Sequence, residues 1–241
     1  MLEKTRGIVL NHVKFGEKSL VTSIYTELLG RKSFLIQRIY TKKSMVHPTF
    51  FQPLTLLDIQ VDLKPNRDLQ RIREIVLIQP FLTIPFDVSK RAITLFLAEI
   101  LTKTIKEEEA NPGLFQYLFT SIQLLDVTDT SIANFHLVFL MNFARYLGCY
   151  PTDNYSSANC LFDIMNGNFQ SQPKKQAPIS KDISYLLHKL LTLTYNDMDA
   201  LLLDHQKRTI LLEVIIAYYN LHMGGIGEIK SLPVLQHIFE D

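Results

Sequence analysis

The first eighty residues consist of short runs of apolar and β-branched side chains, and each run is followed by turn-forming residues. Such runs, rich in Val, Ile, Thr, Tyr and Phe, are typical of β-strands. Gly16 and Gly30 mark the sharpest expected turns, because glycine readily takes the positive φ that tight hairpins often demand. The pattern predicts five strands, at residues 6–13, 20–27, 32–39, 54–61 and 69–76.

Five short strands that follow each other closely predict a small barrel. The connection between residues 40 and 53 is the long one, and it falls where a five-stranded Greek-key barrel has a crossing segment. The OB fold is the architecture that fits best. We therefore expect a multi-domain α+β protein in which an OB-fold barrel at residues 1–79 is followed by an α-helical domain at residues 80–241.

From Pro80 onward the apolar positions recur with helical spacing. Asp87 or Ser89 can cap a first helix that runs through residue 101, since both side chains accept hydrogen bonds from first-turn N–H groups. Asn111 followed by Pro112 is a second start signal, because proline is favoured at the first helical position. This signal predicts a second helix at residues 114–125.

A third helix is expected to begin after Asp129 or Thr130 and to stop at Gly148, and its apolar positions cover most of its circumference. Prolines and turn signals at residues 149–178 then interrupt the helical pattern. Inside this segment, residues 162–169 predict a small hairpin around a type I′ Asn-Gly turn. Helices are expected again from about residue 182, at 206–223 and at 232–239.

Charge is distributed unevenly along the chain, although the net charge of the whole is only +1. The first fifty residues contain nine cations and three acids, a local net charge of +6, whereas residues 81–241 contain 12 cations and 17 acids, a net of −5. Clustered positive charge attracts phosphates through Coulomb steering and counterion release, without base-specific chemistry. Nucleic acid is therefore the first candidate partner of the N-terminal region.

The bulk composition is that of an ordinary folded protein, with 47% apolar and 20% charged residues. Apolar stretches stop well short of the ~18 residues that a membrane span needs, and no signal-peptide core follows the first residues, so we expect a cytoplasmic protein without membrane contact. Cys149 and Cys160 are too few for a disulfide framework and too far apart for a CxxC metal knuckle. We expect two ordinary reduced thiols.

Two features resemble catalytic motifs but lack their context. The glycines at 224–227 follow a helix and have neither the P-loop nor the dinucleotide-binding spacing. The polar group at 197–205 has no accompanying nucleophile or anion cradle. There we expect Asp197 to cap a short helix, with Asp204 and His205 in the turn that follows it. We expect no enzymatic activity, and a hydrolase or nuclease would need clustered carboxylates or metal ligands that the sequence does not offer.

Four short motifs, ordered from one end of the chain to the other, resemble those of the bacterial RecO family. They are Arg-Gly-Ile-Val-Leu at 6–10, Gly-Glu-Lys-Ser-Leu at 16–20, Tyr-Thr-Glu-Leu-Leu-Gly-Arg-Lys at 25–32 and Ile-Lys-Ser-Leu-Pro-Val-Leu at 229–235. The first three resemble the N-terminal barrel of the family, and the last resembles the start of its C-terminal helix. Each motif is short, but together they cover nearly the full length.

The resemblance implies a function in DNA repair and DNA recombination. Members of the family bind single- and double-stranded DNA, anneal complementary strands and have no enzymatic turnover. They act with RecR and with the single-stranded-DNA-binding protein, whose acidic, apolar C-terminal tail docks on the helical domain, and together they help load RecA. The resemblance thus implies a cytoplasmic, nucleoid-associated mediator, although it assigns the tail pocket to no particular residues of this chain.

The sequence departs from many members of the family in the segment 149–178. Those relatives carry a four-cysteine zinc knuckle there, whereas this chain has only Cys149 and Cys160, and no histidine between His136 and His188 can replace the missing thiolates. We therefore expect no zinc and no other cofactor. The hairpin at 162–169 is expected to hold the segment by apolar contacts instead.

DNA binding by a small barrel requires cations that follow the phosphate backbone and exposed rings on which bases stack. Phe15 and Tyr40 lie in or beside turns next to cations, whereas Tyr25 and Phe34 lie in the middle of expected strands and are expected in the core. Any single cation could equally be a solvated surface charge. The candidate nucleic-acid-binding residues are Lys14, Phe15, Lys18, Arg31, Lys32, Arg38, Tyr40, Lys42 and Lys43.

The sequence thus favours a non-enzymatic recombination mediator that binds DNA through its barrel. A second class stays open, namely a protein-interaction scaffold whose basic patch contacts an acidic protein surface and binds nucleic acid only incidentally. The mediator should bind single strands in a strongly salt-dependent manner, whereas the scaffold should bind DNA weakly and independently of its length.

Overall fold

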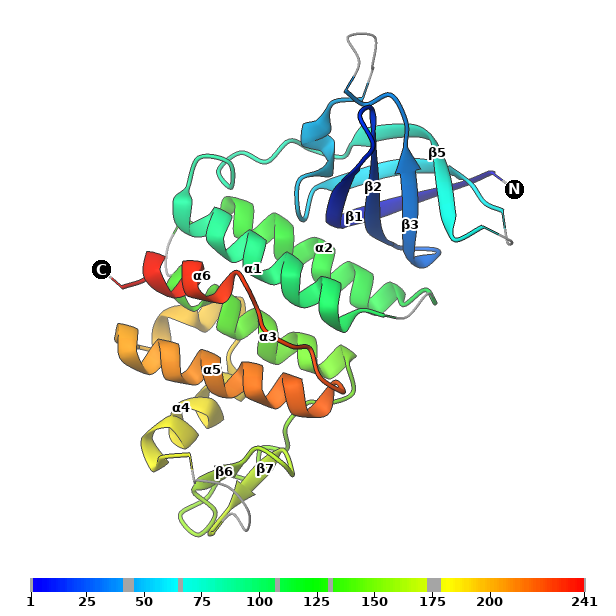
Figure 1. Ribbon diagram of the computed structural model, residues 1–241. Helices are drawn as coiled ribbons and strands as arrows, with labels where there is room; N and C mark the ends of the chain where they lie inside the picture. The colour runs from blue at the N-terminus through cyan, green and yellow to red at the C-terminus, as the bar shows by residue number, and fades with distance from the viewer. Residues whose placement is uncertain are drawn as a thin grey trace. The chain divides into compact units, whose positions relative to one another are not determined.

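The computed structural model describes residues 2–40, 46–64, 67–106, 109–129, 132–172 and 179–240 (Figure 1). The chain divides into two compact units, Met1–Val127 and Thr128–Asp241. The first unit contains the barrel together with the first two helices. The domain boundary that the sequence predicts near residue 80 lies inside this first unit. It separates parts that are expected to fold independently, and it stays a prediction.

Five strands form a closed barrel in the order β1-β2-β3-β5-β4, so the predicted barrel with a helical region after it is confirmed. The neighbours β1–β2, β1–β4, β2–β3 and β4–β5 are antiparallel, whereas β3 and β5 are parallel and pair at only two positions. The strands span Leu2–Phe15 (β1), Ser19–Thr26 (β2), Gly30–Ile36 (β3), Leu56–Asp62 (β4) and Leu69–Leu77 (β5).

The interior of the barrel is filled by apolar side chains that alternate with outward-facing positions along the strands. Gly7 of β1 has to be a glycine, because a Cβ there would lie 2.7 Å from the Cγ2 atom of Ile24. The buried residues of this core are Val9, Ile24, Phe34, Leu57, Ile59 and Val61.

The third strand ends three residues earlier than the sequence predicted. Arg38 has a φ of 60°, in the left-handed region, which turns the chain out of the β2–β3 ladder after Ile36. The long connection that follows includes a 3₁₀ helix at Pro48–Phe51 (η1), capped by His47. The ring of Phe51 is fully buried, so this connection closes one end of the barrel.

Two antiparallel helices follow the barrel in the first unit, α1 at Val88–Thr104 and α2 at Pro112–Val127. The Asp87 side chain accepts a hydrogen bond from the Lys90 N–H at 2.9 Å, and the Asn111 side chain accepts one from the Leu114 N–H at 3.0 Å. Both predicted helix starts are thus confirmed, with Asp87 rather than Ser89 as the first cap.

Arg31 of β3 attaches the barrel to the end of α1. Its Nη1 atom donates hydrogen bonds to the carbonyl oxygens of Thr102 and Ile105, at 2.7 and 2.5 Å, and its Nε atom donates to the Ser23 hydroxyl at 3.0 Å. The last carbonyls of a helix have no partner within the helix and carry partial negative charge, so a guanidinium fits them well. Burial lowers the pKa of Arg31 from its ordinary value.

Arg6 of β1 makes a second attachment, to α2. Its guanidinium forms two hydrogen bonds with the Glu27 carboxylate, at 2.7 and 2.8 Å, which raise the pKa of Arg6 and lower that of Glu27. The same group lies over the rings of Phe115 and Phe119, 5.3 and 4.7 Å from their centroids. A cation over an aromatic face adds about 0.5–2 kcal/mol, so the two rings of α2 fix this arginine.

Asp126, near the end of α2, holds the segment that leads into α1. Its carboxylate is fully buried and accepts hydrogen bonds from the backbone N–H groups of Leu82, Thr83 and Ile84, at 2.8, 2.9 and 3.0 Å. Burial opposes its ionisation, but these bonds and the charge of Lys90 outweigh burial and keep the pKa of Asp126 below its ordinary value of 3.8. The ionised form therefore stabilises the fold.

The second unit is mainly helical. The third helix of the chain, α3, starts later than predicted, because a 3₁₀ turn at Ile132–Asn134 (η2) precedes it. Asn134 rather than Asp129 occupies the cap position, and Thr130, the other predicted cap, lies outside the described residues. Gly148 has the expected positive φ just after the helix end. The helices are α3 at Phe135–Tyr146, α4 at Lys181–Thr192, α5 at His205–His222 and α6 at Leu232–Ile238, with a 3₁₀ helix (η3) at Tyr195–Ala200.

Two polar residues near η3 act differently from the prediction. Thr194, not Asp197, occupies the cap position of η3, and its hydroxyl donates to the Asp197 carboxylate at 2.6 Å. Asp204 caps α5 by accepting from the Lys207 N–H at 2.7 Å. Both acids thus stabilise helix ends, as short polar side chains commonly do.

The predicted hairpin is present, with β6 at Leu161–Asp163 and β7 at Asn168–Gln170. The predicted type I′ turn is wrong, because it needs positive φ at both central residues and only Gly167 of the Asn-Gly pair has it. The turn covers residues 164–167 and is fixed by Asp163. This carboxylate accepts from the Met165 and Asn166 N–H groups at 2.9 and 3.2 Å, and from Asn166 Nδ2 at 2.8 Å.

Arg31→Met should destabilise the protein. The substitution leaves two helix-end carbonyls of α1 without their charged donor, and a hydrogen bond to a charged group contributes about 1.5–3 kcal/mol. We expect the free energy of unfolding, measured by urea titration, to fall by about 2 kcal/mol or more. The exposed Lys18→Met control should stay within about 0.5 kcal/mol of wild type; equal stability of the two variants would contradict the anchoring role of Arg31.

The contribution of Asp126 should depend on pH. Since its folded-state pKa is depressed, its stabilisation is fully present above the unfolded value near 3.8 and is lost as the pH falls through the folded value. Asp126→Asn should therefore be less stable than wild type at pH 7, and the difference should shrink below about pH 4. Urea titrations at both pH values measure this, with the exposed Glu17→Gln as control; a gap that persists at low pH would contradict the ionic contribution.

Candidate nucleic-acid interface

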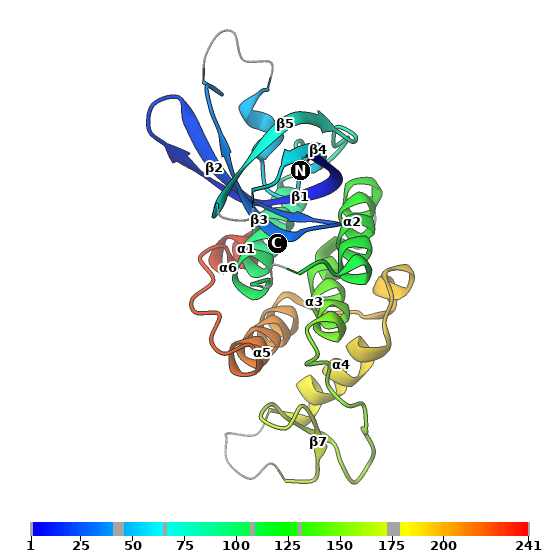
Figure 2. The same ribbon diagram turned by 90° about the vertical axis from the view of Figure 1, so that its right-hand side faces the viewer.

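The turn between β1 and β2 projects from the barrel (Figure 2). Lys14 and Lys18 lie on either side of it with exposed side chains, and the Phe15 ring is 57% exposed. The turn is tight because Gly16 takes a φ of 65°. An exposed aromatic ring between two cations is the arrangement that the sequence predicted for this turn.

Tyr40 lies at the same end of the barrel. Its ring is 44% exposed, and the Lys14 Nζ atom lies 5.9 Å from the ring centroid. The exposed Arg38 also belongs to this end, because the β2–β3 ladder closes with the pair Leu20 and Ile36. We call the five residues Lys14, Phe15, Lys18, Arg38 and Tyr40 the hairpin-end surface.

The structure separates the other predicted residues from this surface. Arg31 and Lys32 lie at the opposite end of β3, about 17 Å along the strand at roughly 3.3 Å per residue. Lys42 and Lys43 lie outside the described residues. The predicted basic patch is therefore two surfaces at the two ends of one strand. Tyr25 and Phe34 are buried, as predicted for the core.

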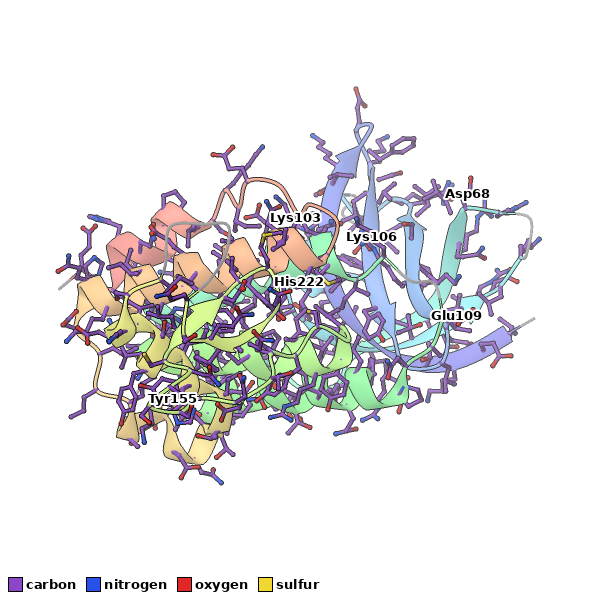
Figure 3. All side chains as sticks on the ribbon, turned by 90° about the horizontal axis from the view of Figure 1, so that it is seen from below. Asp68, Lys103, Lys106, Glu109, Tyr155 and His222 are labelled. Carbon is purple, nitrogen blue, oxygen red and sulfur yellow. The ribbon has the colours of Figure 1, made fainter. Side chains whose placement is uncertain are left out.

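Arg31 and Lys32 form part of a pocket of about 460 Å³ between β3 and the turn from β4 to β5. On the N-terminal side of the pair Ser33–Leu69, β3 has no paired neighbour in β5, so the barrel wall opens there. Figure 3 labels Lys106, after α1, and Asp68, just before β5. The residues that line this β3–β5 pocket are Arg31, Lys32, Ser33, Leu63, Lys64, Arg67, Asp68, Gln70 and Lys106.

Gln70 holds the turn that carries two of these cations. Its side-chain oxygen accepts from the Lys64 N–H at 2.9 Å, and its Nε2 atom donates to the carbonyl oxygens of Lys64 and Arg67, at 3.0 and 2.5 Å. The Arg67 N–H in turn donates to the Lys64 carbonyl at 3.1 Å. Because Gln70 is buried and neutral, it holds the backbone of Lys64 and Arg67 without cancelling the charge of their side chains.

Three cations of this pocket were missed by the sequence analysis, namely Lys64, Arg67 and Lys106. Residues 51–80 contain four cations and four acids, so a count of local charge shows nothing there. Part of this negative charge is paired elsewhere, since Arg73 binds Asp62 at 2.8 Å. Two cations within the single turn between the fourth and fifth expected strands were the available signal.

Cys149 lies against a methionine side chain. Cys149 Sγ lies 3.9 Å from the Met223 sulfur, and burial raises the pKa of its thiol, which disfavours the thiolate that zinc binds. Within the part of the chain that the structure describes, no three or more His, Cys, Asp or Glu side chains gather in a way that could hold a metal ion. The donors present therefore do not fit a four-ligand zinc knuckle.

The β6–β7 hairpin, inside the segment 149–172, is packed against aromatic side chains. Phe162 and Phe169 are buried with ring centroids 5.3 Å apart, and Phe162 lies 5.9 Å from the ring of Tyr218 on α5. Asn154 makes two hydrogen bonds to the backbone of Phe169, and the Tyr218 hydroxyl donates to the Cys149 carbonyl at 2.7 Å. These contacts join both ends of the segment to the helices of the second unit.

The described helices include none long and apolar enough to cross a membrane. Two family models match the chain, Recombination protein O N terminal at residues 1–81 and Recombination protein O C terminal at residues 85–233. They account for both the barrel and most of the helical region.

Full-length relatives point to the same family. A DNA repair protein RecO of Bacteroides fragilis is 42% identical over 242 residues, covering 100% of both chains. One of Phocaeicola vulgatus is 38% identical, covering 99% of this chain and 100% of its own. One of Flavobacterium psychrophilum is 36% identical over 98% of both. With both family models and these relatives in agreement, the chain belongs to the RecO family of DNA repair proteins.

Proposed function

We propose that this RecO-family protein is a recombination mediator that binds single- and double-stranded DNA through its barrel and anneals complementary strands. The observation that carries this proposal is the hairpin-end surface, where cations and exposed rings lie side by side. The Lys14 Nζ atom lies 5.9 Å from the Tyr40 ring centroid there, and Phe15 is exposed between Lys14 and Lys18. Proteins that bind single strands without reading sequence combine these two kinds of side chain.

Annealing follows from charge neutralisation. Two complementary strands repel each other through their phosphates, and a protein that neutralises phosphates on both lowers this repulsion so that the bases can pair. The barrel offers cations at both ends of β3, at the hairpin-end surface and at the β3–β5 pocket, separated by about 17 Å. This reaction needs no bond-breaking chemistry, and we propose no catalytic residue.

The partners of this function are proposed on family membership. RecR and the single-stranded-DNA-binding protein would act with the chain in the cytoplasm, at the nucleoid, and the acidic, apolar tail of the latter would dock on the helical region. Loading of RecA onto covered single strands would be the outcome.

DNA binding should depend steeply on salt. If about six phosphates are contacted, the affinity for single strands should fall roughly as the fourth power of salt concentration, at about 0.7 per contact.

Tyr40→Ala should weaken binding by more than about 1 kcal/mol, the scale of one stacked base. Fluorescence anisotropy of labelled oligonucleotides at several salt concentrations measures both.

Tyr40→Phe is the matched control, because it keeps the ring and removes only the hydroxyl. It should bind like wild type. Weak binding by the wild-type protein that does not depend on strand length would instead favour the second class, a protein-interaction scaffold with only incidental nucleic-acid binding.

We also propose that the segment 149–172 is held without zinc. The buried pair Phe162 and Phe169, the turn fixed by Asp163 and the bonds of Asn154 supply the contacts that a metal would otherwise make. Each polar atom named here has a hydrogen-bond partner, as a segment without a metal centre requires.

Purified protein should therefore contain less than about 0.5 equivalents of zinc by atomic emission, and EDTA should leave its melting temperature unchanged. Phe169→Ala should lower the free energy of unfolding by about 3–5 kcal/mol, the usual cost of a buried phenylalanine. Stoichiometric zinc, or a melting temperature that falls with EDTA, would overturn the proposal.

A further inference from the structure

The β3–β5 pocket has the properties of a preformed anion site. Five cationic side chains and one carboxylate line it, and they come from three separate parts of the first unit: β3, the turn from β4 to β5, and the segment after α1. Cations that converge from distant segments repel each other unless an anion lies between them. Their convergence on one cavity therefore points to an anionic ligand.

Hydrogen bonds of two residues, Arg31 and Gln70, position the walls of the pocket before any ligand binds. Arg31 is held by the carbonyl oxygens of Thr102 and Ile105, neutral groups that leave its positive charge in place. Gln70 holds the backbone of Lys64 and Arg67. A site whose cations are already positioned loses less side-chain and loop entropy on binding.

The lining selects among anions. Leu63 is the one apolar side chain among the nine lining residues, so an acidic peptide with apolar side chains would find little surface to bury there. A phosphate group, by contrast, presents several oxygens that accept charge-assisted hydrogen bonds from lysine and arginine. The volume of about 460 Å³ lies within the ~300–1,000 Å³ of small-ligand sites, so a phosphate can enter together with its sugar.

We propose that the β3–β5 pocket binds one phosphate group of a nucleic-acid strand, with Lys64, Arg67 and Lys106 as its cationic ligands. The proposal rests on the proposed DNA binding and adds a second, enclosed anchoring point to the hairpin-end surface. The phosphate can be an internal phosphodiester or the monoester at a strand end.

The test compares wild type with Lys64→Ala/Arg67→Ala and, separately, Lys106→Ala, using anisotropy of short single strands over a salt series. Each lost phosphate contact should reduce the magnitude of the salt slope by about 0.7, and the double variant should bind several-fold more weakly. Arg91→Gln/Lys181→Gln removes two exposed cations outside both surfaces and should bind like wild type. Circular dichroism melting curves confirm that each variant is folded.

Strands with a 5′-phosphate and with a 5′-hydroxyl identify the source of the phosphate. A preference of the wild type for the phosphorylated end, lost in both pocket variants, supports a strand-end monoester; equal affinity for both ends together with weaker binding by the variants supports an internal phosphodiester. If wild type binds steeply with salt and both pocket variants bind identically to it, the pocket proposal is overturned while the DNA-binding function stands. If wild type itself does not bind, the function fails first.

Discussion

The attachment of the barrel to α1 in the first unit depends on one half-buried guanidinium, that of Arg31. Arg31 extends from the start of β3 to the last carbonyl oxygens of α1. These oxygens have no donor within the helix, and the guanidinium supplies one. Its partners are neutral, so the positive charge is half-buried but not cancelled, and burial lowers its pKa without removing the charge under ordinary conditions. One side chain thus joins barrel to helix and leaves a fixed cation in the wall of a pocket. Because of this double role, removing the charge of Arg31 would change both the stability of the first unit and the charge of the pocket.

The closed barrel determines where further cations can lie. Its interior is filled by apolar side chains, so charged groups are confined to the outward-facing strand positions and the turns. Lys14 and Lys18 occupy one turn, and Lys64 and Arg67 occupy another. Both turns depend on a specific residue, Gly16 for its positive φ in the first and Gln70 for its three side-chain bonds in the second. The cations are thus carried on backbone that the fold has already positioned.

The sequence predicted the elements well and their assembly less well. Strands and helix starts depend on local signals, so the five strands, the caps at Asp87 and Asn111 and the small hairpin were recognised. The early end of β3 was missed because a positive φ at a non-glycine residue such as Arg38 has no reliable sequence signal. The β3–β5 pocket was missed because it joins residues 31–33 with residues 63, 64, 67, 68 and 70 and with residue 106, and only the tertiary fold brings these together. The same tertiary contacts made Arg31 a structural residue, although composition alone presents it as a surface cation.

If the segment 149–172 is held without zinc, as we propose, its fold replaces one kind of cross-link by another. A structural zinc site concentrates its stabilisation in four bonds to one ion, whereas here the contacts are distributed over buried rings and several hydrogen bonds. Distributed contacts tolerate the loss of any one polar bond but not of a central ring, because removing a buried phenylalanine opens a cavity that its neighbours cannot fill. They also require that each buried polar atom finds a partner, which Asp163 and Asn154 achieve within the segment. The cysteine positions are then free of the constraint that metal binding imposes, and Cys149 contacts a methionine sulfur instead.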